Sequence, residues 1–355
     1  MSNDPRDIGG KKLVEALRLI GRDAELRARM VDFLREIEAD VKNPGPVRDD
    51  VIGPVVDALH EDTDVYTVHL ADGTEIQYLY RTKIARDLLL SAGKAPSHVW
   101  EPQTTKLLIH LAAWISGDVV VGGAYFGDQA VLVARAIAAR GLKVHCFEPN
   151  SAQAAMLRKN IDANALENVE VNESGLWHQT GDLMRLEGFD SFANAVVVTD
   201  GDGFPTTTID DYLAARHRKL GLIQLDIEGA ELPALQGAAG TLAADKPAVV
   251  FELHRTYVDW TNGLRNTPIC SLLLELGYEI YAIRDINSHL EMPEHLVELV
   301  ELDHVYLEGP PHGFNMLAVP SGFVLDPGVF HVMRGVSPKL LPHKDPALHH
   351  PTEGF

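Results

Sequence analysis

The stretch from Gly117 to Asn150 reads GDVVVGGAYFGDQAVLVARAIAARGLKVHCFEPN and changes its hydrophobic period along its length. Val119 to Val121 is a short β-branched run, as in strands that are covered on both faces of a parallel sheet. Apolar residues then recur at helical spacing from Asp128 to Ala139, and Lys143 to Phe147 makes a second strand. The stretch therefore predicts a strand–helix–strand unit of an α/β protein.

A glycine turn made of Gly122, Gly123 and Gly127 joins the first strand to the helix, and Glu148 stands at the end of the second strand. Glycine permits unusual backbone angles and lets a ligand approach closely. A carboxylate at this strand end binds ribose hydroxyls in nucleotide-binding units. Such glycines also occur where a strand and a helix merely pack closely.

Two cofactor classes fit the turn. A dinucleotide site requires G-x-G-x-x-G, and this chain meets that pattern only with Ala124 in the middle position. An S-adenosylmethionine site tolerates a looser turn, because no pyrophosphate has to be seated on the helix. The turn alone does not choose between them.

The bulk composition narrows the class of protein. A chain of 355 residues with 46% hydrophobic residues suits one large domain with extensions, or two smaller domains. A net charge of −20 argues against nucleic acid as a partner. No segment reads as a signal peptide or a membrane span, so we expect a cytoplasmic protein without a membrane partner. Cys146 and Cys270 lack metal or redox spacing and should be buried thiols.

Residues 1–99 are expected to form an N-terminal extension of helices and a hairpin. Lys11 to Val41 carries apolar stripes at helical spacing, which pack on their own domain or, alternatively, form a homo-oligomer contact or a lid. Val65 to Leu79 alternates on both sides of Asp72-Gly73, the signature of a β-hairpin.

Beyond Glu148, helical and strand patterns alternate, which predicts a parallel, doubly wound sheet. Expected strands are 169–171, 222–225, 248–251, 278–283 and 314–319, with two short strands between 175 and 198; expected helices are 151–164, 209–217, 232–242 and 269–276. Ser151 is the expected cap of the first helix. Residues 335–355 are expected to form a flexible tail, although its residues His343, His349 and His350 are also metal-ligand types.

Polar residues cluster where the predicted strands end, which is where ligands bind in open α/β sheets. Asp226, Glu228 and Glu231 follow one strand, and Glu252 and His254 close the next. Acids near a helix N-terminus are often only caps. Three acids within six residues beside a glycine favour function for Asp226 and leave Glu228 and Glu231 open.

The order of these motifs resembles a known family. The pieces are WEPQTTKLL, GGAYFG, FEPN, NVEV, TTTIDDYL, LDIEGAELPALQGA and VVFELH, between Trp100 and His254. This block is similar to the FkbM-type S-adenosylmethionine-dependent methyltransferases. The resemblance implies a Rossmann-like class I methyltransferase sheet over residues 100–334, with seven strands of which the last is antiparallel. It also implies O-methylation of a hydroxyl on a small polyhydroxylated acceptor, such as a sugar or a secondary metabolite.

The resemblance carries the cofactor site onto this chain. The residues expected to bind S-adenosylmethionine are Gly123, Ala124, Tyr125, Gly127, Glu148, Pro149 and Asn150. The chain departs from the family pattern at three positions, since Val121 stands where the family has an acid, Gly122 where Val is usual, and Tyr125 replaces Asn. Val121 and Tyr125 keep open a non-catalytic partner protein with the same fold, and the glycine turn keeps open an NAD-dependent oxidoreductase.

Methyl transfer from a sulfonium needs mainly in-line positioning and removal of the acceptor's proton. His254 is the preferred general base, because histidine titrates near neutral pH. Asp226 is the second catalytic candidate. Asp226 and Glu252 together are also candidate ligands for a divalent cation such as Mg²⁺, which would acidify the hydroxyl.

Overall fold

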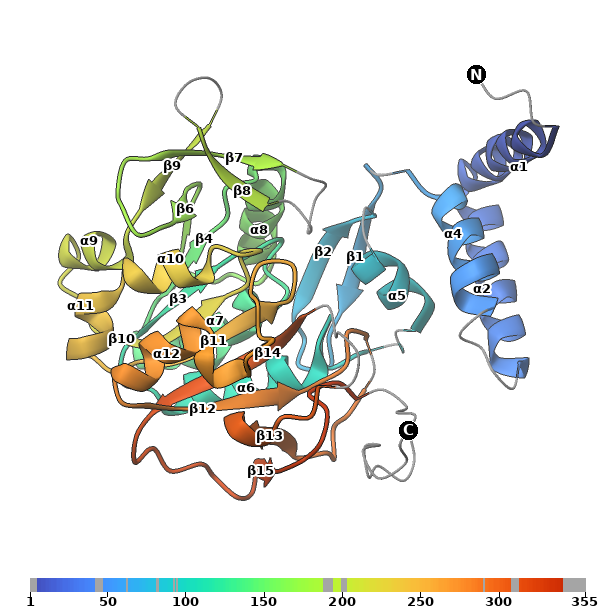
Figure 1. Cartoon of the computed structure of the whole chain (residues 1–355). Helices are drawn as coiled ribbons and strands as arrows, with labels where there is room; N and C mark the ends of the chain where they lie inside the picture. The colour runs from blue at the N-terminus through green and yellow to red at the C-terminus, as the bar shows by residue number, and fades with distance from the viewer. Residues whose placement is uncertain are drawn as a thin grey trace. The chain divides into compact units, whose positions relative to one another are not determined.

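The computed structural model describes residues 5–41, 47–61, 63–80, 83–91, 93, 95–187, 194–198, 203–289, 291–307 and 313–340. The chain divides into two compact units (Figure 1). The first contains Met1–Val68 and Gln77–Ala95, and the second contains His69–Ile76 and Pro96–Phe355. No helix in the described part is long and apolar enough to span a membrane.

The N-terminal part has the predicted helices and hairpin. Its elements are α1 (Pro5–Gly21), α2 (Ala24–Asp40), η1 (Arg48–Ile52), α4 (Gly53–Leu59), β1 (Val65–His69), β2 (Glu75–Leu79) and α5 (Lys83–Ser91). Asp23 caps α2, because its carboxylate accepts hydrogen bonds from the amides of Glu25 and Leu26. The same helices expose Leu19 and Phe33, and self-association through them stays a prediction.

A nine-stranded sheet in the order β15-β13-β12-β14-β11-β10-β3-β4-β5 dominates the second unit (Figure 1). The strands are β3 (Asp118–Gly122), β4 (Val144–Phe147), β5 (Val169–Asn172), β10 (Leu220–Leu225), β11 (Ala248–His254), β12 (Tyr278–Arg284), β13 (Val297–Glu301), β14 (Gly313–Pro320) and β15 (Phe330–Met333). Strand β14 runs antiparallel to both β11 and β12, whereas β10 is parallel to β3 and β11. The predicted seven-stranded sheet with a reversed last strand is confirmed, and β13 and β15 extend it.

Helices cover both faces of this sheet because successive strand residues point to opposite faces. Val120 belongs to one buried cluster and its neighbours Val119 and Val121 to the other. The first cluster takes residues from α9 (Ile209–Ala214), α10 (Glu231–Gln236), α11 (Ala239–Ala244) and α12 (Pro268–Glu275); the second takes residues from α6 (Pro102–Trp114), α7 (Ala130–Ile137) and α8 (Ser151–Ala163). Short turns η2 (Ala138–Arg140), η4 (Leu264–Asn266) and η5 (Leu302–His304) complete the unit.

Two local predictions about helices needed correction. Asn150, not Ser151, caps α8, since its side chain accepts from the amides of Ala152 and Gln153. The helix predicted over 232–242 is two helices, α10 and α11. They are separated at Gly237, where a Cβ would lie 2.1 Å from the carbonyl oxygen of Trp177.

A second, four-stranded sheet replaces the predicted pair of short strands. Its order is β6-β9-β7-β8, with β6 (Gly175–Leu176), β7 (Leu183–Glu187), β8 (Asn194–Val198) and β9 (Phe204–Thr207). The unpredicted β9 contains the first two residues of the Thr206–Thr208 run, and Thr208 caps α9 by accepting from the amide of Asp211 at 2.9 Å.

The expected flexible tail does not begin at Gly335. Val336 forms a parallel bridge with Val305, and Lys339 forms one with Asp285, so the chain stays attached to the sheet edge through Leu340. The candidate ligands His343, His349 and His350 lie outside the described residues.

Candidate functional site

The glycine turn after β3 lies against the end of β10. The amides of Gly123 and Ala124 both donate to the carbonyl oxygen of Phe147, at 3.0 and 3.2 Å, which ties the turn to β4. Gly123 has φ +74°, and a Cβ there would lie 1.8 Å from the carbonyl oxygen of Asp226. Only glycine fits this position, because both its backbone angle and its neighbour exclude a side chain.

Glu148 joins the turn to the start of α8. Its side chain is buried, and its two carboxylate oxygens each accept a backbone hydrogen bond at 2.8 Å, one from Tyr125 and one from Asn150. The carboxylate is therefore oriented before a ligand with hydroxyl groups arrives.

The remaining predicted cofactor residues lie in the same two segments, the glycine turn and the residues after β4. Gly127, at φ +90°, closes the turn, and a Cβ there would lie 2.4 Å from a methyl carbon of Leu157 on α8. Pro149 is half-buried between Glu148 and Asn150. The structure thus brings all seven predicted residues together, with the side chain of Asn150 occupied in capping α8.

Val121 is 2% exposed, so its side chain belongs to the core and not to a ligand site. Asp128 follows the turn directly, and the sequence did not mark it as a cofactor residue. Burial raises the pKa of Asp128 to about 6, and the charge of Asp226 adds to the rise. An acid is therefore present at the turn even though the family's position holds Val121.

Four carboxylates gather where β10, β11 and α6 meet, and together they form what we call the acid group: Glu101, Asp226, Glu228 and Glu252. One carboxylate oxygen each of Asp226, Glu228 and Glu252 lie within 4.8 Å of one another. Glu101 precedes α6 with φ +48°, and Asn315 on β14 donates to it at 2.7 Å. The sequence predicted the pairing of Asp226 with Glu252 but not Glu101.

The pKa values of the acid group are all raised, chiefly because the surrounding protein displaces water. The pKa is about 6 for Asp226, about 7 for Glu228, about 8 for Glu101 and about 10 for Glu252. Repulsion from Asp226 adds to the rise in the other three. The charge of Lys339 opposes the rise in the pKa of Asp226.

Glu231 holds the loop after β10 through hydrogen bonds to the backbone of that loop. Its carboxylate accepts from the amides of Ile227 and Gly229, at 2.9 and 3.0 Å, so this buried acid has the capping role left open above. Glu228 takes a left-handed backbone angle, φ +51°, and accepts a hydrogen bond from the hydroxyl of Tyr257 at 3.1 Å. Glu231 is therefore a structural residue, whereas Glu228 belongs to the acid group.

Residues from later parts of the chain also lie at the edge of the sheet that carries the acid group. Lys339 donates to Asn287, which in turn donates to Glu101 at 3.3 Å. Asp285 accepts from the amides of Gln103 and Thr104 and so anchors the start of α6. None of these residues carries a sequence signal, apart from the position of Glu101 before a helix-starting proline.

His254 ends β11 beside Glu252, and Gly313 on β14 separates the two. A Cβ on Gly313 would lie 2.4 Å from Oε1 of Glu252 and 2.7 Å from Cδ2 of His254. The amide of Thr256 donates to Nδ1 of His254 at 3.1 Å. An amide can only donate, so Nδ1 carries no proton and the neutral ring holds its proton on Nε2.

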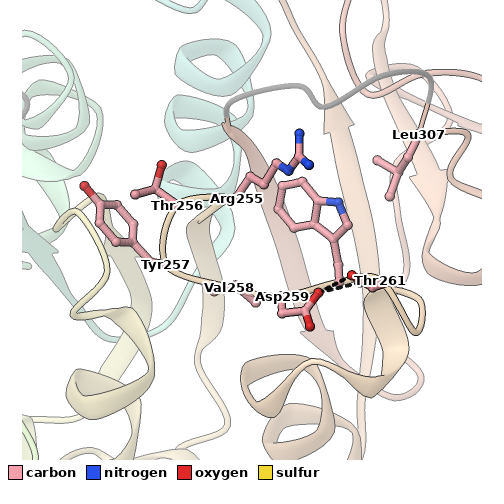
Figure 2. Close-up of a pocket in the computed structure, with 8 residues that line it drawn as sticks. Arg255, Thr256, Tyr257, Val258, Asp259, Thr261 and Leu307 are labelled. Carbon is pink, nitrogen blue, oxygen red and sulfur yellow. Dashed lines mark hydrogen bonds between the residues drawn. The ribbon is translucent and has the colours of Figure 1, made fainter.

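A pocket of about 670 Å³ opens directly beyond His254 (Figure 2). It is lined by Arg255, Thr256, Tyr257, Val258, Asp259, Trp260, Thr261 and Leu307. Tyr257 lines this pocket and also contacts Glu228, so the pocket adjoins the acid group. Its volume is within the usual range for small-molecule sites, about 300–1,000 Å³.

Comparison with known proteins gives a match to one family model. Residues 122–280 match the family model described as the methyltransferase FkbM domain. This range contains the glycine turn, Glu148, the loop after β10 and the end of β11. It excludes Glu101, Asn315 and Lys339. No protein with a curated description matches the chain.

Similar solved structures include a methyltransferase FkbM from Methylobacillus flagellatus, 20% identical with a TM-score of 0.35, covering 57% of this chain and 43% of that one. An S-adenosylmethionine-dependent O-methyltransferase from Thermotoga maritima is 13% identical with a TM-score of 0.34, covering 74% of this chain and 79% of that one. An O-methyltransferase from Bacillus cereus in complex with S-adenosylhomocysteine is 17% identical with a TM-score of 0.34, covering 67% of this chain and 91% of that one. The chain thus spans less than half the length of the Methylobacillus protein.

Proposed function

Residues 122–280 form an FkbM-type methyltransferase domain, and from this premise we propose that the protein transfers the methyl group of S-adenosylmethionine to a hydroxyl of a small polyhydroxylated acceptor. One observation carries the proposal. The glycine turn touches the backbone of Asp226, so the cofactor turn and the acid group meet at a single point. A cofactor on one side and a proton acceptor on the other are what methyl transfer to oxygen requires.

Glu148 is the proposed ligand of the cofactor's ribose, because its carboxylate is already oriented by the amides of Tyr125 and Asn150. The turn from Gly123 to Gly127 lies against the methionine part. In the family pattern, an acid stands at the position of Val121 and orients the methionine amine. Asp128 is proposed to bind that amine in this chain instead. Val121 itself favours the alternative of a non-catalytic relative, which the experiments below distinguish.

Asp226 is the proposed proton acceptor. It reaches solvent, and with a pKa of about 6 it is ionised at neutral pH. The tautomer of His254 argues against our sequence-based preference for this histidine. Its Nδ1 lone pair is engaged by Thr256, and Nε2 carries a proton in the neutral ring. His254 is better suited to donate that proton to the acceptor oxygen and so to orient it.

The acid group also fits a hard divalent cation. Oxygen donors from Asp226, Glu228 and Glu252 lie close enough to converge on one ion, and carboxylates are preferred ligands of Mg²⁺. Repulsion between these carboxylates adds to the rise in pKa that burial causes, and a bound cation would relieve that repulsion. When bound, Mg²⁺ would lower the pKa of a coordinated hydroxyl.

The pocket beyond His254 is the proposed acceptor site. Tyr257 and Trp260 supply flat apolar surfaces, and Arg255, Asp259 and Thr261 supply hydrogen-bonding groups. A polyhydroxylated molecule presents both kinds of surface, since its ring hydrogens are apolar and its hydroxyls are polar. The pocket therefore suits a sugar or a secondary metabolite better than a uniformly apolar compound.

Calorimetry with S-adenosylhomocysteine tests the cofactor assignment. We expect saturable binding to the full-length protein, and no binding at near-millimolar ligand would reject the proposal. A parallel titration with NAD tests the oxidoreductase, which we expect to show no heat of binding. Cofactor binding without methyl transfer to any acceptor in a panel of sugars and phenols would favour the non-catalytic alternative.

Turnover of two variants tests the proton acceptor. Asp226→Asn should lower kcat by about 10²–10⁴-fold, whereas His254→Gln should act mainly through KM for the acceptor. Both should bind S-adenosylhomocysteine as the wild type does. A chelator added to the wild-type enzyme separates the two roles of Asp226: loss of activity that Mg²⁺ restores indicates the cation, and unchanged activity indicates direct proton transfer. A large kcat loss confined to His254→Gln would restore the histidine as the base.

A further inference from the structure

His98, His289 and Glu291 form a second cluster of metal-ligand side chains, apart from the acid group and outside the family match. One ring nitrogen of each histidine and one carboxylate oxygen of Glu291 all lie within 4.8 Å of one another. The two imidazoles are stacked with their centroids 5.1 Å apart, and both are at most 3% exposed. Two buried histidines facing each other beside a carboxylate are unusual for a purely structural contact, because polar groups are costly to bury.

The hydrogen bonds around this cluster fix where the proton sits on each ring. The hydroxyl of Ser97 donates to Glu291 at 2.6 Å, so its oxygen accepts from Nδ1–H of His98 at 3.0 Å. His289 donates Nδ1–H to the carbonyl oxygen of Val99 at 3.2 Å. In both neutral rings the lone pair is therefore on Nε2. Histidines that bind metals are commonly held in this way, with the other ring nitrogen donating to a carbonyl or a carboxylate-linked group.

His98 supplies an independent observation in favour of a ligand at this cluster. Its Nε2 is buried and has no hydrogen-bond partner among the described residues. A buried acceptor left without a partner costs about 1–3 kcal/mol.

We propose that His98, His289 and Glu291 bind a divalent transition-metal ion, Zn²⁺ by the chemistry of the donors. Two imidazoles and one carboxylate are a known Zn²⁺ ligand set that leaves a fourth position for water. Tetrahedral Zn²⁺, with bonds of about 2.0–2.1 Å, requires its ligand atoms to approach more closely than the present limit of 4.8 Å. Glu291 is exposed, and its Oε1 lies 3.6 Å from Nδ1 of His98, so its carboxylate would have to leave Ser97 and turn toward Nε2 of the two histidines.

A bound ion would link the segments around His98 and His289 and so stabilise the edge of the sheet that carries the acid group. His98 is three residues before Glu101, and His289 is two residues after Asn287, which donates to Glu101. The two segments also meet through Gln103, which donates to the sulfur of Met292 at 3.3 Å. Crosslinking them through a metal would hold Glu101 in place within the acid group. This role does not depend on the proposed methyl transfer.

Titration of the full chain, free of any affinity tag and stripped of metal, with Co²⁺ tests the site. We expect one equivalent of Co²⁺ to give visible absorption bands of four- or five-coordinate geometry, which Zn²⁺ then removes. Zn²⁺ should also raise the melting temperature. His98→Gln and Glu291→Gln should each weaken binding at least about 10-fold. Glu291 is exposed, so its variant remains informative if His98→Gln does not fold.

Three controls locate the bound ion. His331→Gln changes an exposed histidine on β15 and should leave Co²⁺ binding intact. Glu252→Gln should leave it intact as well, which separates this cluster from the acid group. The combined change of His343, His349 and His350 to Gln removes the histidines near the C-terminus. Absence of one-to-one binding in the wild type, or full binding by a folded Glu291→Gln, would overturn the proposal, and loss of binding in the C-terminal variant would reassign the ion.

Discussion

Gly123 and Asp226 are in backbone contact, so closely that a Cβ on Gly123 would lie 1.8 Å from the carbonyl oxygen of Asp226. The two residues end neighbouring parallel strands, β3 and β10. Because the contact involves only backbone atoms, it fixes the distance between the cofactor turn and the acid group whatever their side chains do. The relationship is the physical basis for the first prediction.

Gly123→Ala should abolish S-adenosylhomocysteine binding and destabilise the protein by several kcal/mol, because both the contact and the φ of +74° exclude a Cβ. Gly141→Ala is the matched control. It also has a positive φ, +67°, but no atom within 4 Å of its Cβ position. It should cost about 1–2 kcal/mol and keep full cofactor affinity. Urea unfolding and calorimetry measure the two effects, and equal losses in both variants would contradict the steric argument.

Glu148→Gln should weaken S-adenosylhomocysteine binding by about 1–3 kcal/mol, roughly 5- to 150-fold. The amide keeps one acceptor for the backbone but loses the charge and the second oxygen. Glu173→Gln is the control. Glu173 follows the neighbouring strand β5 and forms an exposed ion pair with Arg158. That control should bind the cofactor like the wild type. Indistinguishable affinities for the two variants would remove Glu148 from the cofactor site.

Tyr257→Phe should reduce Mg²⁺ affinity about 5-fold, equivalent to about 1 kcal/mol. The lost hydrogen bond lowers the pKa of Glu228, so its removal makes Glu228 harder to ionise. Tyr281→Phe is the control, since its hydroxyl also donates to a glutamate, Glu279, at the same 3.1 Å but on β12. Calorimetric titration with Mg²⁺ compares the two, and a greater loss in Tyr281→Phe would be incompatible with a cation at the acid group.

Without a cation, the melting temperature should fall as the pH rises from 6.5 to 8. In this window Glu101 and Glu228, with pKa values of about 8 and 7, are partly protonated in the folded protein. Both are ionised in the unfolded chain, where a glutamate titrates near pH 4.3. The folded state thus binds more protons than the unfolded state, and stability declines with pH.

Glu252→Gln removes the most strongly shifted carboxyl, whose pKa is about 10. This variant should show a shallower fall of melting temperature over the same pH range. Mg²⁺ should stabilise the wild type more at pH 8 than at pH 6.5, because it competes with protons for the same oxygens. A melting temperature that rises with pH in the absence of cations would contradict the raised pKa values.

Much of the sheet could be predicted because its central strands are β-branched runs with glycine or acids at their ends. Val119 to Val121 and Leu222 to Leu225 show this pattern. Strand β13 was missed, because its sequence VELVE places charged residues within a short apolar run and resembles an exposed segment. Its charges are accommodated locally, as Arg284 lies 3.5 Å from Glu298.

The candidate site was predictable where its residues follow parallel strands in sequence order. Glu148, Asp226 and Glu252 all come from such strand ends. Glu101, Asn315 and Lys339 could not be predicted, because they reach the site from a helix start, an antiparallel strand and the C-terminal segment. The tautomer of His254 could not be predicted for a different reason: it depends on one backbone amide, that of Thr256, which no sequence pattern reveals.

The bridge between Asp285 and Lys339 bears on how this protein can be shortened. A chain trimmed at Arg334, where the sequence suggests a loose end, would lack the ammonium group that offsets the negative charge of Asp226 and Glu101. Such a truncation would retain the whole family match and still titrate differently. Crystallisation or fusion designs should therefore keep at least Leu340.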